Sequence, residues 1–343
     1  MAYTTISKAT DYFNTKTYSG NSSTQNITGI GFQPDMVWTK KRDGTDDHNI
    51  FDAVRGVTKE VRPNKSDTED TATNGLTAFG TDGYTIGDWG LMNQGHTYVS
   101  WNWRAGAGAG SSNTDGSINT TSTSVNTTSG FSISKYTGTG SVATIGHGLG
   151  VVPKMIWVKR LDSSSDWRIY HHSNGNTHQM FLNTDGNKDD DNTIWNDTSP
   201  TSSVFTVGTN TGSNANGGTY VAYCFAEKMG FSRFGSYLGN GNADASFIYT
   251  GFRPALIIGK ALTANYDWWM LDTKRDTHNS GDTVLYPNAN AGDASNTVLD
   301  IVSNGFKMRN SNIQFCQSGT SYIYMAWAEA SLVGSNNEPC KAR

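Results

Sequence analysis

Short apolar runs separated by polar turn residues dominate the chain, and three of these runs share one pattern. Each begins at a proline and ends six residues later at a lysine, in FQPDMVWTK, VVPKMIWVK and FRPALIIGK, which end at Lys40, Lys159 and Lys260. Because apolar residues do not alternate with polar ones, each run predicts a strand covered on both faces. Proline is tolerated as the first residue of such a strand. We expect the lysine to mark the point where each strand returns to water.

Three further landmarks recur in the same order around these strands. They are a tyrosine before a Gly turn (Tyr18, Tyr136, Tyr237), a short strand (Tyr84, Phe205, Phe306) and a final strand with alternating bulky residues (Tyr98, Tyr220, Tyr322). The first tyrosine precedes the proline by 16, 17 and 17 residues, and the last tyrosine follows it by 64, 67 and 68. Such regular spacing predicts internal repetition with one architecture per copy.

We therefore predict an all-β protein of three tandem β-sandwich, jelly-roll-like repeats of about 100 residues each. The predicted segments are an N-terminal arm (1–10), repeat 1 (11–104), a linker (105–129), repeat 2 (130–229), repeat 3 (230–333) and a C-terminal tail (334–343). The linker, rich in Gly, Ser, Thr and Asn, is typical of a flexible connection. Repeats 2 and 3 are almost contiguous, so we expect a stiff pair, with repeat 1 either free to swing or held by a partner. We expect the tail to be poorly ordered.

Composition supports the β assignment and excludes several classes of protein. Charged residues make up 16% of the 343 residues, below the usual ~25%, while 38 glycines and many Ser, Thr and Asn supply polarity. A net charge of -4 without a long basic run argues against nucleic-acid binding. No apolar segment suits a signal peptide or a membrane span, so we expect neither export by that route nor membrane insertion. Cys224, Cys316 and Cys340 are an odd set that predicts thiols, buried or free, rather than a disulfide framework.

Candidate catalytic and metal-binding groups are few. Asp166, Asp267 and Asp272 are the carboxylates most worth testing, but a glycosidase needs two at about 5–10 Å in one cleft. We favour capping or surface solvation for them and expect no enzyme activity. The acidic run from Asp185 to Asp191 lacks the order of a calcium loop, and His171, His172 and His178 lack a zinc spacing. We predict no metal and no cofactor.

Aromatic side chains beside polar turn residues suggest one binding chemistry. Sugar rings stack on aromatic faces while nearby polar groups bond their hydroxyls. The candidate glycan contacts are Trp167, Tyr170, His171, Trp195 and Trp268. The alternative, which we favour, is that these tryptophans close the ends of each sandwich.

Several segments resemble a repeat family of virion proteins from marine tailed bacteriophages, including those of cyanobacteria. The resemblance lies in TDYFNTKTYSGNSSTQNITGIGFQPDMVWTKKR, IFDAVRGVTKE, LTAFGTDGYTIG and HTYVSWNWRAG of repeat 1, and extends more loosely over repeats 2 and 3. Repeat 3 departs most, since Ile258 replaces Trp38 and the IFDAVRGVTK segment has no clear counterpart. The resemblance implies a β-rich structural or tail-fibre component of a virion and carries over no active site.

The expected function is that of a non-enzymatic virion structural protein, exposed as a head decoration or fibre or as a tail-fibre component, which aids adhesion to host surface glycans. The alternatives are a capsid-cementing protein without ligand binding, and a soluble lectin or glycan-degrading enzyme. Expected partners are other capsid or tail proteins and a host glycan, and a homo-oligomer stays open. We expect assembly in the host bacterial cytoplasm, with the N-terminal arm and repeat 1 as anchor and repeats 2 and 3 projecting.

Overall fold

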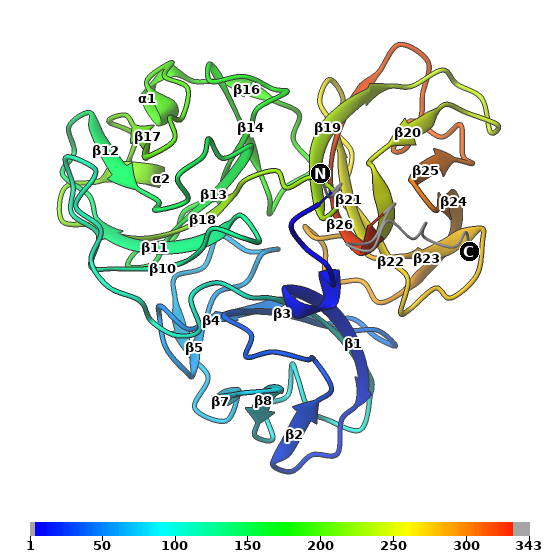
Figure 1. The fold of residues 1–343 in the computed structure, drawn as a ribbon, viewed down its shortest axis with the longest axis horizontal. Coiled ribbons are helices and arrows are strands. Elements are labelled where there is room, and N and C mark those ends of the chain that lie inside the picture. The colour runs from blue at the N-terminus through cyan, green and yellow to red at the C-terminus, as the bar shows by residue number, and fades with distance from the viewer. Residues whose placement is uncertain (1–3, 332–343) are drawn as a thin grey trace.

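A computed structural model of the protein describes residues 4–331 and confirms the all-β prediction. Within these residues the helices are short: η1 (Ala9–Asp11), α1 (Asn192–Trp195) and α2 (Thr211–Asn214). No helix in the described part of the chain has the length and apolar character to cross a bilayer. The strands form three lobes around a common centre, which we call lobe 1 (residues 4–104), lobe 2 (residues 105–229) and lobe 3 (residues 230–331) (Figure 1).

One antiparallel four-strand order occurs in all three lobes: β1-β9-β3-β4, β11-β18-β13-β14 and β19-β26-β21-β22. In lobe 1 the strands are β1 (Phe13–Ser19), β9 (Thr97–Trp103), β3 (Met36–Lys41) and β4 (Asn49–Asp52). In lobe 2 they are β11 (Phe131–Thr137), β18 (Thr219–Phe225), β13 (Met155–Arg160) and β14 (Arg168–His171). In lobe 3 they are β19 (Ser232–Leu238), β26 (Ser321–Ser331), β21 (Phe252–Ala261) and β22 (Trp269–Asp272). The proline-led runs thus lie inside each sheet, between two neighbours.

A second sheet belongs to each lobe, and it is smaller than the main sheet in lobes 1 and 2. In lobe 1 its order is β2 (Gln25–Thr28), β8 (Gly83–Ile86) and β7 (Leu76–Gly80), and a separate pair joins β5 (Lys59–Glu60) to β6 (Asp70–Thr71). In lobe 2, β12 (Ala143–Gly146) pairs with β17 (Val204–Val207), while β15 (His178–Phe181) and β16 (Asp189–Asp190) extend the main sheet. In lobe 3 the order is β20 (Phe247–Tyr249), β25 (Gly305–Met308), β24 (Ala294–Val302) and β23 (Gly281–Val284).

The landmark tyrosines meet across the ladder between the first and last strands of each main sheet. Their rings stack with centroids 5.3, 5.1 and 4.9 Å apart in the pairs Tyr18–Tyr98, Tyr136–Tyr220 and Tyr237–Tyr322. The glycine that follows the first tyrosine is required by a close backbone approach. A Cβ at Gly20 would lie 1.9 Å from the Gln94 carbonyl oxygen, and one at Gly239 would lie 2.1 Å from that of Gln317. The repeated tyrosine-and-glycine turn is therefore a packing motif.

The three lobes share one hydrophobic core, which crosses every boundary between them. Aromatic rings meet there at centroid distances of 5.8 Å (Trp38–Trp157, lobes 1 and 2), 5.6 Å (Phe225–Trp327, lobes 2 and 3) and 5.3 Å (Trp103–Trp327, lobes 1 and 3). Burying such side chains stabilises by ~25 cal/mol per Å² of apolar surface. Our expectation that repeat 1 swings freely was wrong, because separating lobe 1 would expose these rings to water.

Residues 105–129, which we expected to be a flexible linker, are ordered, and that expectation was also wrong. Within them, β10 (Ser122–Asn126) pairs with β11 and adds a strand to the sheet of lobe 2. Asp35 of lobe 1, which is fully buried, accepts hydrogen bonds from the backbone N–H groups of Ala105, Ala107 and Gly108 at 2.6, 3.0 and 2.7 Å. Small residues here permit close backbone contacts that larger ones would block.

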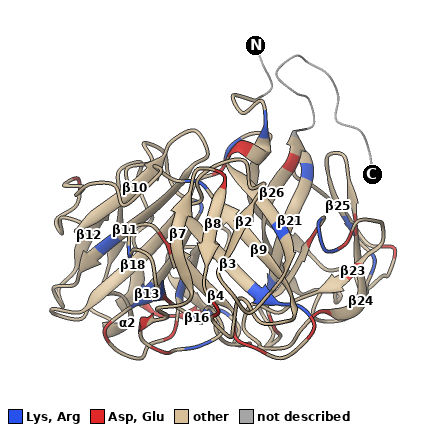
Figure 2. Cartoon of the chain, turned by 90° about the horizontal axis from the view of Figure 1, so that it is seen from below, with Lys and Arg blue, Asp and Glu red and all other residues tan. Residues whose placement is uncertain are grey.

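The first and last described elements of the chain, η1 and β26, lie in contact. In the predicted N-terminal arm, Ile6 and Ala9 are buried in the shared core, and η1 packs against β26. The predicted C-terminal tail (334–343), with Cys340, lies outside the described residues, as do residues 1–3, 332 and 333. Cys224 and Cys316 are buried and free. Many charged residues lie in the loops along the lower edge of Figure 2.

Candidate functional site

The lysines that end the proline-led strands are fully buried, so our expectation that they return the chain to water was wrong. The Nζ atom of Lys159 donates to the carbonyl oxygens of Ser165 (2.7 Å) and of Ser66 in lobe 1 (3.1 Å). Lys260 donates in the same way to Tyr266 and to Asp185 in lobe 2. Burial lowers the pKa of Lys40, Lys159 and Lys260 to about 8 in each case. Each lysine thus closes a loop, and two of them bind a neighbouring lobe.

Two of the candidate glycan-binding residues also bind neighbouring lobes. Trp167 donates its indole N–H to the Arg62 carbonyl oxygen of lobe 1 at 2.9 Å, and Trp268 donates to that of Phe181 in lobe 2 at 2.8 Å. His48 holds the corresponding place in lobe 1, with Nε2 3.1 Å from the Tyr286 carbonyl oxygen of lobe 3. These three contacts run around the ring of lobes, one at each joint.

The remaining candidates, Tyr170, His171 and Trp195, are also interior. Tyr170 and Trp195 pack edge to face within lobe 2 at a centroid distance of 6.0 Å. His171 Nε2 lies 3.3 Å from the Tyr324 carbonyl oxygen of lobe 3, and burial lowers its pKa to about 3, so the ring is neutral. All five predicted glycan contacts are at most 5% exposed, so their rings present no face to a sugar. That prediction was wrong because Trp167, His171 and Trp268 lie against another lobe, while Tyr170 and Trp195 are buried inside the core of lobe 2.

The carboxylates of Asp166 and Asp267 stabilise the turns that precede Trp167 and Trp268. Asp166 accepts from the Asn183 side chain at 2.8 Å, and the same Asn183 accepts from the Trp167 backbone N–H at 3.0 Å. Asp267 and Asn288 repeat the arrangement beside Trp268, at 2.6 and 2.9 Å. Both aspartates therefore stabilise a turn through hydrogen bonds. This agrees with the capping role that we favoured for them.

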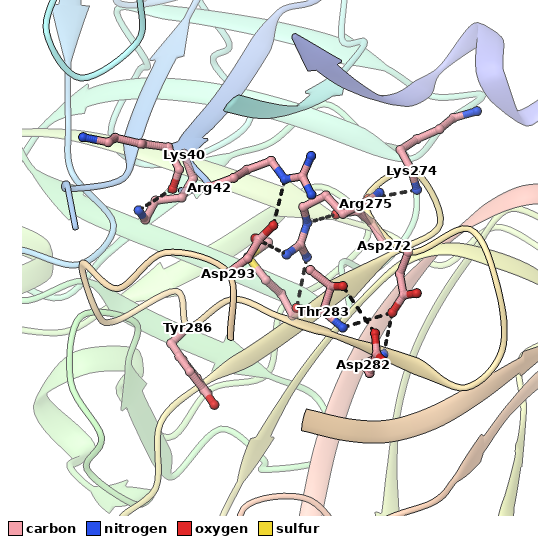
Figure 3. Close-up of polar contacts among 12 residues, drawn as sticks. Lys40, Arg42, Asp272, Lys274, Arg275, Asp282, Thr283, Tyr286 and Asp293 are labelled. Carbon is pink, nitrogen blue, oxygen red and sulfur yellow. Dashed lines mark hydrogen bonds and ion pairs between the residues drawn. The ribbon is translucent and has the colours of Figure 1, made fainter. Parts of the chain in front are cut away.

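Asp272 lies in an ion-pair network at the joint between lobes 3 and 1. It accepts from Arg275 Nε at 2.6 Å and from the Trp101 indole of lobe 1 at 3.1 Å. Asp293 lies between Arg275 and Arg42 of lobe 1, with contacts of 2.9 and 2.8 Å (Figure 3). The charges of Asp272 and Arg275, both fully buried, are compensated within the joint.

The joint between lobes 1 and 2 is built in the same way. Asp52 pairs with Arg55 at 2.5 Å and accepts from the Tyr223 hydroxyl of lobe 2 at 2.6 Å, while Arg55 also contacts Glu69 at 3.4 Å. From the sequence we found no clear counterpart in repeat 3 of the IFDAVRGVTK segment of repeat 1. That conclusion was wrong. The segment MLDTKRD supplies it, because Asp272 and Arg275 match Asp52 and Arg55 in spacing and in contacts.

The joint between lobes 2 and 3 departs from this scheme. His171 and Asn174 stand where the other joints have aspartate and arginine, and both side-chain polar atoms of Asn174 lack a partner within the described residues. Lys188 stands where the other two joints have an acidic residue, Glu69 or Asp293. Its backbone N–H donates to Leu262 in lobe 3, as that of Glu69 donates to Leu161 and that of Asp293 to Arg42. Among residues 4–331, Lys188 has no ion-pair partner.

A groove with a volume of about 570 Å³ opens at this joint. It is lined by His172 and Ser173 of lobe 2 and by strands β19 and β20 of lobe 3. A hollow of about 390 Å³ beside it shares Ser173 and Ser236 and includes Lys188. A third hollow, of about 230 Å³, shares Arg233 and Tyr249 with the first groove. We call these connected hollows the β19 groove.

Exposed apolar side chains gather along the β19 groove. Eight large apolar side chains are exposed among the described residues, and four line the groove: Met229 (68%), Leu238 (61%), Tyr249 (48%) and Phe247 (46%). The groove also contains the Arg233–Glu227 ion pair at 3.0 Å and His172, whose Nε2 lies 2.9 Å from the Phe234 carbonyl oxygen. It therefore combines aromatic faces with hydrogen-bonding and charged groups.

The sequence analysis missed Phe247 and Tyr249, although comparison of the copies contains a signal. Ile27, Ile145 and Ile248 pair with Tyr84, Phe205 and Phe306, so the strands β2, β12 and β20 correspond. The residues flanking these isoleucines are Asn26 and Thr28 in lobe 1 and Thr144 and Gly146 in lobe 2. In lobe 3 both flanking positions carry aromatic residues. The corresponding strands of lobes 1 and 2 form without them, so the fold does not require aromatic residues there.

The acidic run of lobe 2 is occupied by local contacts. Asp191 accepts from the Thr193 backbone N–H at 2.8 Å at the start of α1, and Asp189 accepts from the Gln179 side chain at 3.0 Å. Within residues 4–331, no three His, Cys, Asp or Glu side chains are grouped as metal ligands would be.

Comparison with known proteins yields one match. Neither a curated protein nor a solved structure matches the chain. A model of a family described as a domain of unknown function, DUF7483, matches residues 8–331. This span contains all three lobes and the joints between them, so the match treats them as one domain. The chain belongs to the DUF7483 family.

Proposed function

We propose that this protein is a non-enzymatic structural component of a bacteriophage virion, exposed on the particle and adhesive toward host surface glycans. The sequence resemblance to virion repeat proteins motivates the assignment to a particle. The proposal places the chain in the virion after assembly in the host cytoplasm, beside capsid or tail proteins.

One observation carries the structural part of the proposal. The polar and charged side chains that recur in the lobes bind one lobe to another or hold a turn, as Lys159, Trp167 and Asp272 illustrate. Polar residues that recur in the lobes and hold the structure together favour a rigid structural protein over an enzyme. A rigid body suits a component that must survive outside a cell.

The structure changes the expected division into anchor and projection. Because lobe 1 shares its core with lobes 2 and 3, deleting residues 1–104 would expose that core and unfold the chain. The proposal therefore treats the three lobes as one projecting body.

The test is to locate the protein in purified virions. Virions are purified by two density gradients, digested and examined by mass spectrometry, and intact particles are labelled with gold-conjugated antibody raised against the whole folded chain. We expect peptides of the chain at a fixed ratio to the major capsid protein, with label on the particle surface. Label at the tail supports adsorption, and label over the head supports decoration. Absence of the protein from purified particles overturns the proposal.

The capsid-cementing alternative is separated by a second measurement. Virions lacking the protein are heated, and genome release is followed with a DNA-binding dye. A lower release temperature with unchanged adsorption to host cells favours cementing, whereas slower adsorption with unchanged release temperature favours adhesion. Release of reducing ends from host polysaccharide by the purified protein would contradict the non-enzymatic assignment.

A further inference from the structure

The β19 groove combines two departures from the pattern of the other lobes. Its aromatic residues, Phe247 and Tyr249, replace polar or small residues at the matching positions of lobes 1 and 2. Both project from the same side of β20, because residues two apart in a strand share a face. Exposed aromatic surface lowers solubility and adds nothing to the core, so a binding role explains its retention.

The second departure is electrostatic. At the other two joints the residue matching Lys188 is acidic and is neutralised by a buried arginine. At this joint Asn174 replaces that arginine, and Lys188 lies at one end of the groove without an ion-pair partner among the described residues. Arg233 adds a second cation farther along, although Glu227 shares its charge. The charged side chains that line the groove are thus two cations, Lys188 and Arg233, and one carboxylate, Glu227, in a chain whose net charge is -4.

We propose that the β19 groove binds a linear oligosaccharide that carries carboxylate groups. Sugar rings stack on Phe247 and Tyr249, while Ser173, Ser236 and His172 face the hydroxyl groups and Lys188 pairs with a carboxylate. The seven residues of β19 span roughly 23 Å, which accommodates several rings in line. The inference rests on the proposed adhesive function, for which it supplies the site and the ligand class.

An extended peptide is the competing occupant, because β19 is the edge strand of its sheet. Much of that edge is already occupied. Ser232 pairs with Lys228, and the outward groups of Phe234 contact His172 and Glu227. Alternation along the strand leaves Ser236 and Leu238 as the remaining outward positions. Two positions are few for strand addition, so the observations favour a sugar.

The test uses the full chain and variants at exposed positions. In Phe247→Asn with Tyr249→Thr, lobe 3 receives the residues that lobe 1 carries at the same places, so the fold should persist. The control is Val142→Thr with Val152→Ser, which removes exposed apolar surface from lobe 2 (53% and 43% exposed). Binding is measured on an array of neutral and acidic bacterial polysaccharides, and by calorimetry with tetragalacturonate and cellotetraose. Melting temperatures establish that each variant is folded, and Tyr249→Thr alone serves if the double variant is not.

We expect the wild type and the control to bind acidic glycans equally, and the aromatic variant to lose at least tenfold in affinity. Lys188→Ala should weaken binding of the acidic ligand at least threefold and reduce its dependence on salt. Failure of every acidic glycan on the array to bind, or equal binding by the aromatic variant, overturns the proposal. Equal affinity for acidic and neutral ligands also overturns it, because Lys188 then has no role.

A peptide probe distinguishes the competing occupant. The synthetic segment 111–126 of this chain covers the matching edge in lobe 2 and is offered to the groove. Binding of this peptide that is lost in Ser236→Pro, which removes an outward N–H, together with no glycan binding, would identify a peptide site and overturn the sugar proposal. These results are independent of virion content, so the inference can fail while the protein is still found on particles.

Discussion

At the scale of single residues, the most informative feature is a buried lysine at the end of each proline-led strand. A buried ammonium group is costly, and these lysines offset the cost with hydrogen bonds to carbonyl oxygens of closed loops. Desolvation is the main cause of the lowered pKa of Lys40, Lys159 and Lys260. The same residues therefore connect local loop geometry to the stability of the whole chain.

The pKa shift predicts how stability depends on pH. Below about pH 8 the lysines are charged in both the folded and the unfolded chain, and the cost of the buried charge is fully present. As the pH rises from about 8 toward 10.5, the unfolded chain holds more protons than the folded one, so the free energy of unfolding should rise. Above about pH 10 the trend should reverse, because the unfolded chain ionises tyrosines such as Tyr223, whose pKa burial raises.

Urea titrations at half-unit intervals between pH 7 and pH 9.5 measure this trend. Lys159→Met should reduce the rise in the free energy of unfolding by about a third, because Lys40 and Lys260 keep their contributions. Lys65→Met, at a side chain that is 43% exposed, should leave the rise unchanged. A wild-type free energy that stays flat or falls over this interval would show that the lysines keep their ordinary pKa.

At the scale of elements, the segment from Ala105 to Asn126 shows how a low-complexity stretch becomes structure. Its strand β10 completes an edge of lobe 2, and Ile118 forms a bridge with Ile145 and joins the lobe 2 core. The start of the segment is held by Asp35 of lobe 1, which accepts hydrogen bonds from the backbone N–H groups of Ala105 and Gly108. The segment is a strap between two lobes, and its small residues allow it to lie close to their backbones.

Removing the Asp35 side chain tests the strap. Asp35→Ala leaves three backbone N–H groups without their acceptor and should lower the free energy of unfolding by roughly 3 kcal/mol. Hydrogen exchange followed by mass spectrometry should show faster exchange in residues 105–126 before it does so elsewhere. Asp115→Ala, at an exposed position of the same segment, should change stability by less than ~0.5 kcal/mol. Unaltered exchange in the strap would mean that Asp35 does not anchor it.

At the scale of the whole molecule, the joints form a closed cycle. Lobe 1 binds lobe 2 through Asp52 and Tyr223, lobe 2 binds lobe 3 through His171, and lobe 3 binds lobe 1 through Asp272 and Trp101. Because the core is continuous as well, we expect the chain to unfold in one cooperative transition instead of lobe by lobe.

Arg275→Met tests this coupling. It leaves Asp272 buried without its cation, which should cost about 3–5 kcal/mol. Calorimetry should show one transition at a lower temperature, and exchange should accelerate in all three lobes together. Arg309→Met, which removes solvent-screened ion pairs within lobe 3, should change the melting temperature far less than Arg275→Met does. A second transition in the Arg275 variant, with lobes 1 and 2 unaffected, would contradict a cooperative cycle.

The sequence predicted what depends on local patterns and missed what depends on contacts between lobes. Apolar runs and turn residues identified the strands, and the recurrent tyrosines marked a real packing motif. Trp167 and Trp268 were misplaced because polar neighbours indicate solvent only when no other lobe covers them. Phe247 and Tyr249 were missed because β20 is short and lacks a landmark. The strap was taken for a linker because composition does not reveal a distant acceptor such as Asp35.

The contact between the first and last strands of the described chain has a consequence for biosynthesis. Phe13 of β1 stacks on Trp327 of β26 at a centroid distance of 5.8 Å, so the ring of lobes closes only after the ribosome has made both strands. Until then lobes 1 and 2 carry an uncovered aromatic surface at Trp103 and Phe225, the rings that Trp327 contacts in the folded chain. Nascent chains stalled before residue 321 should therefore recruit chaperones and aggregate when released, whereas complete chains should not.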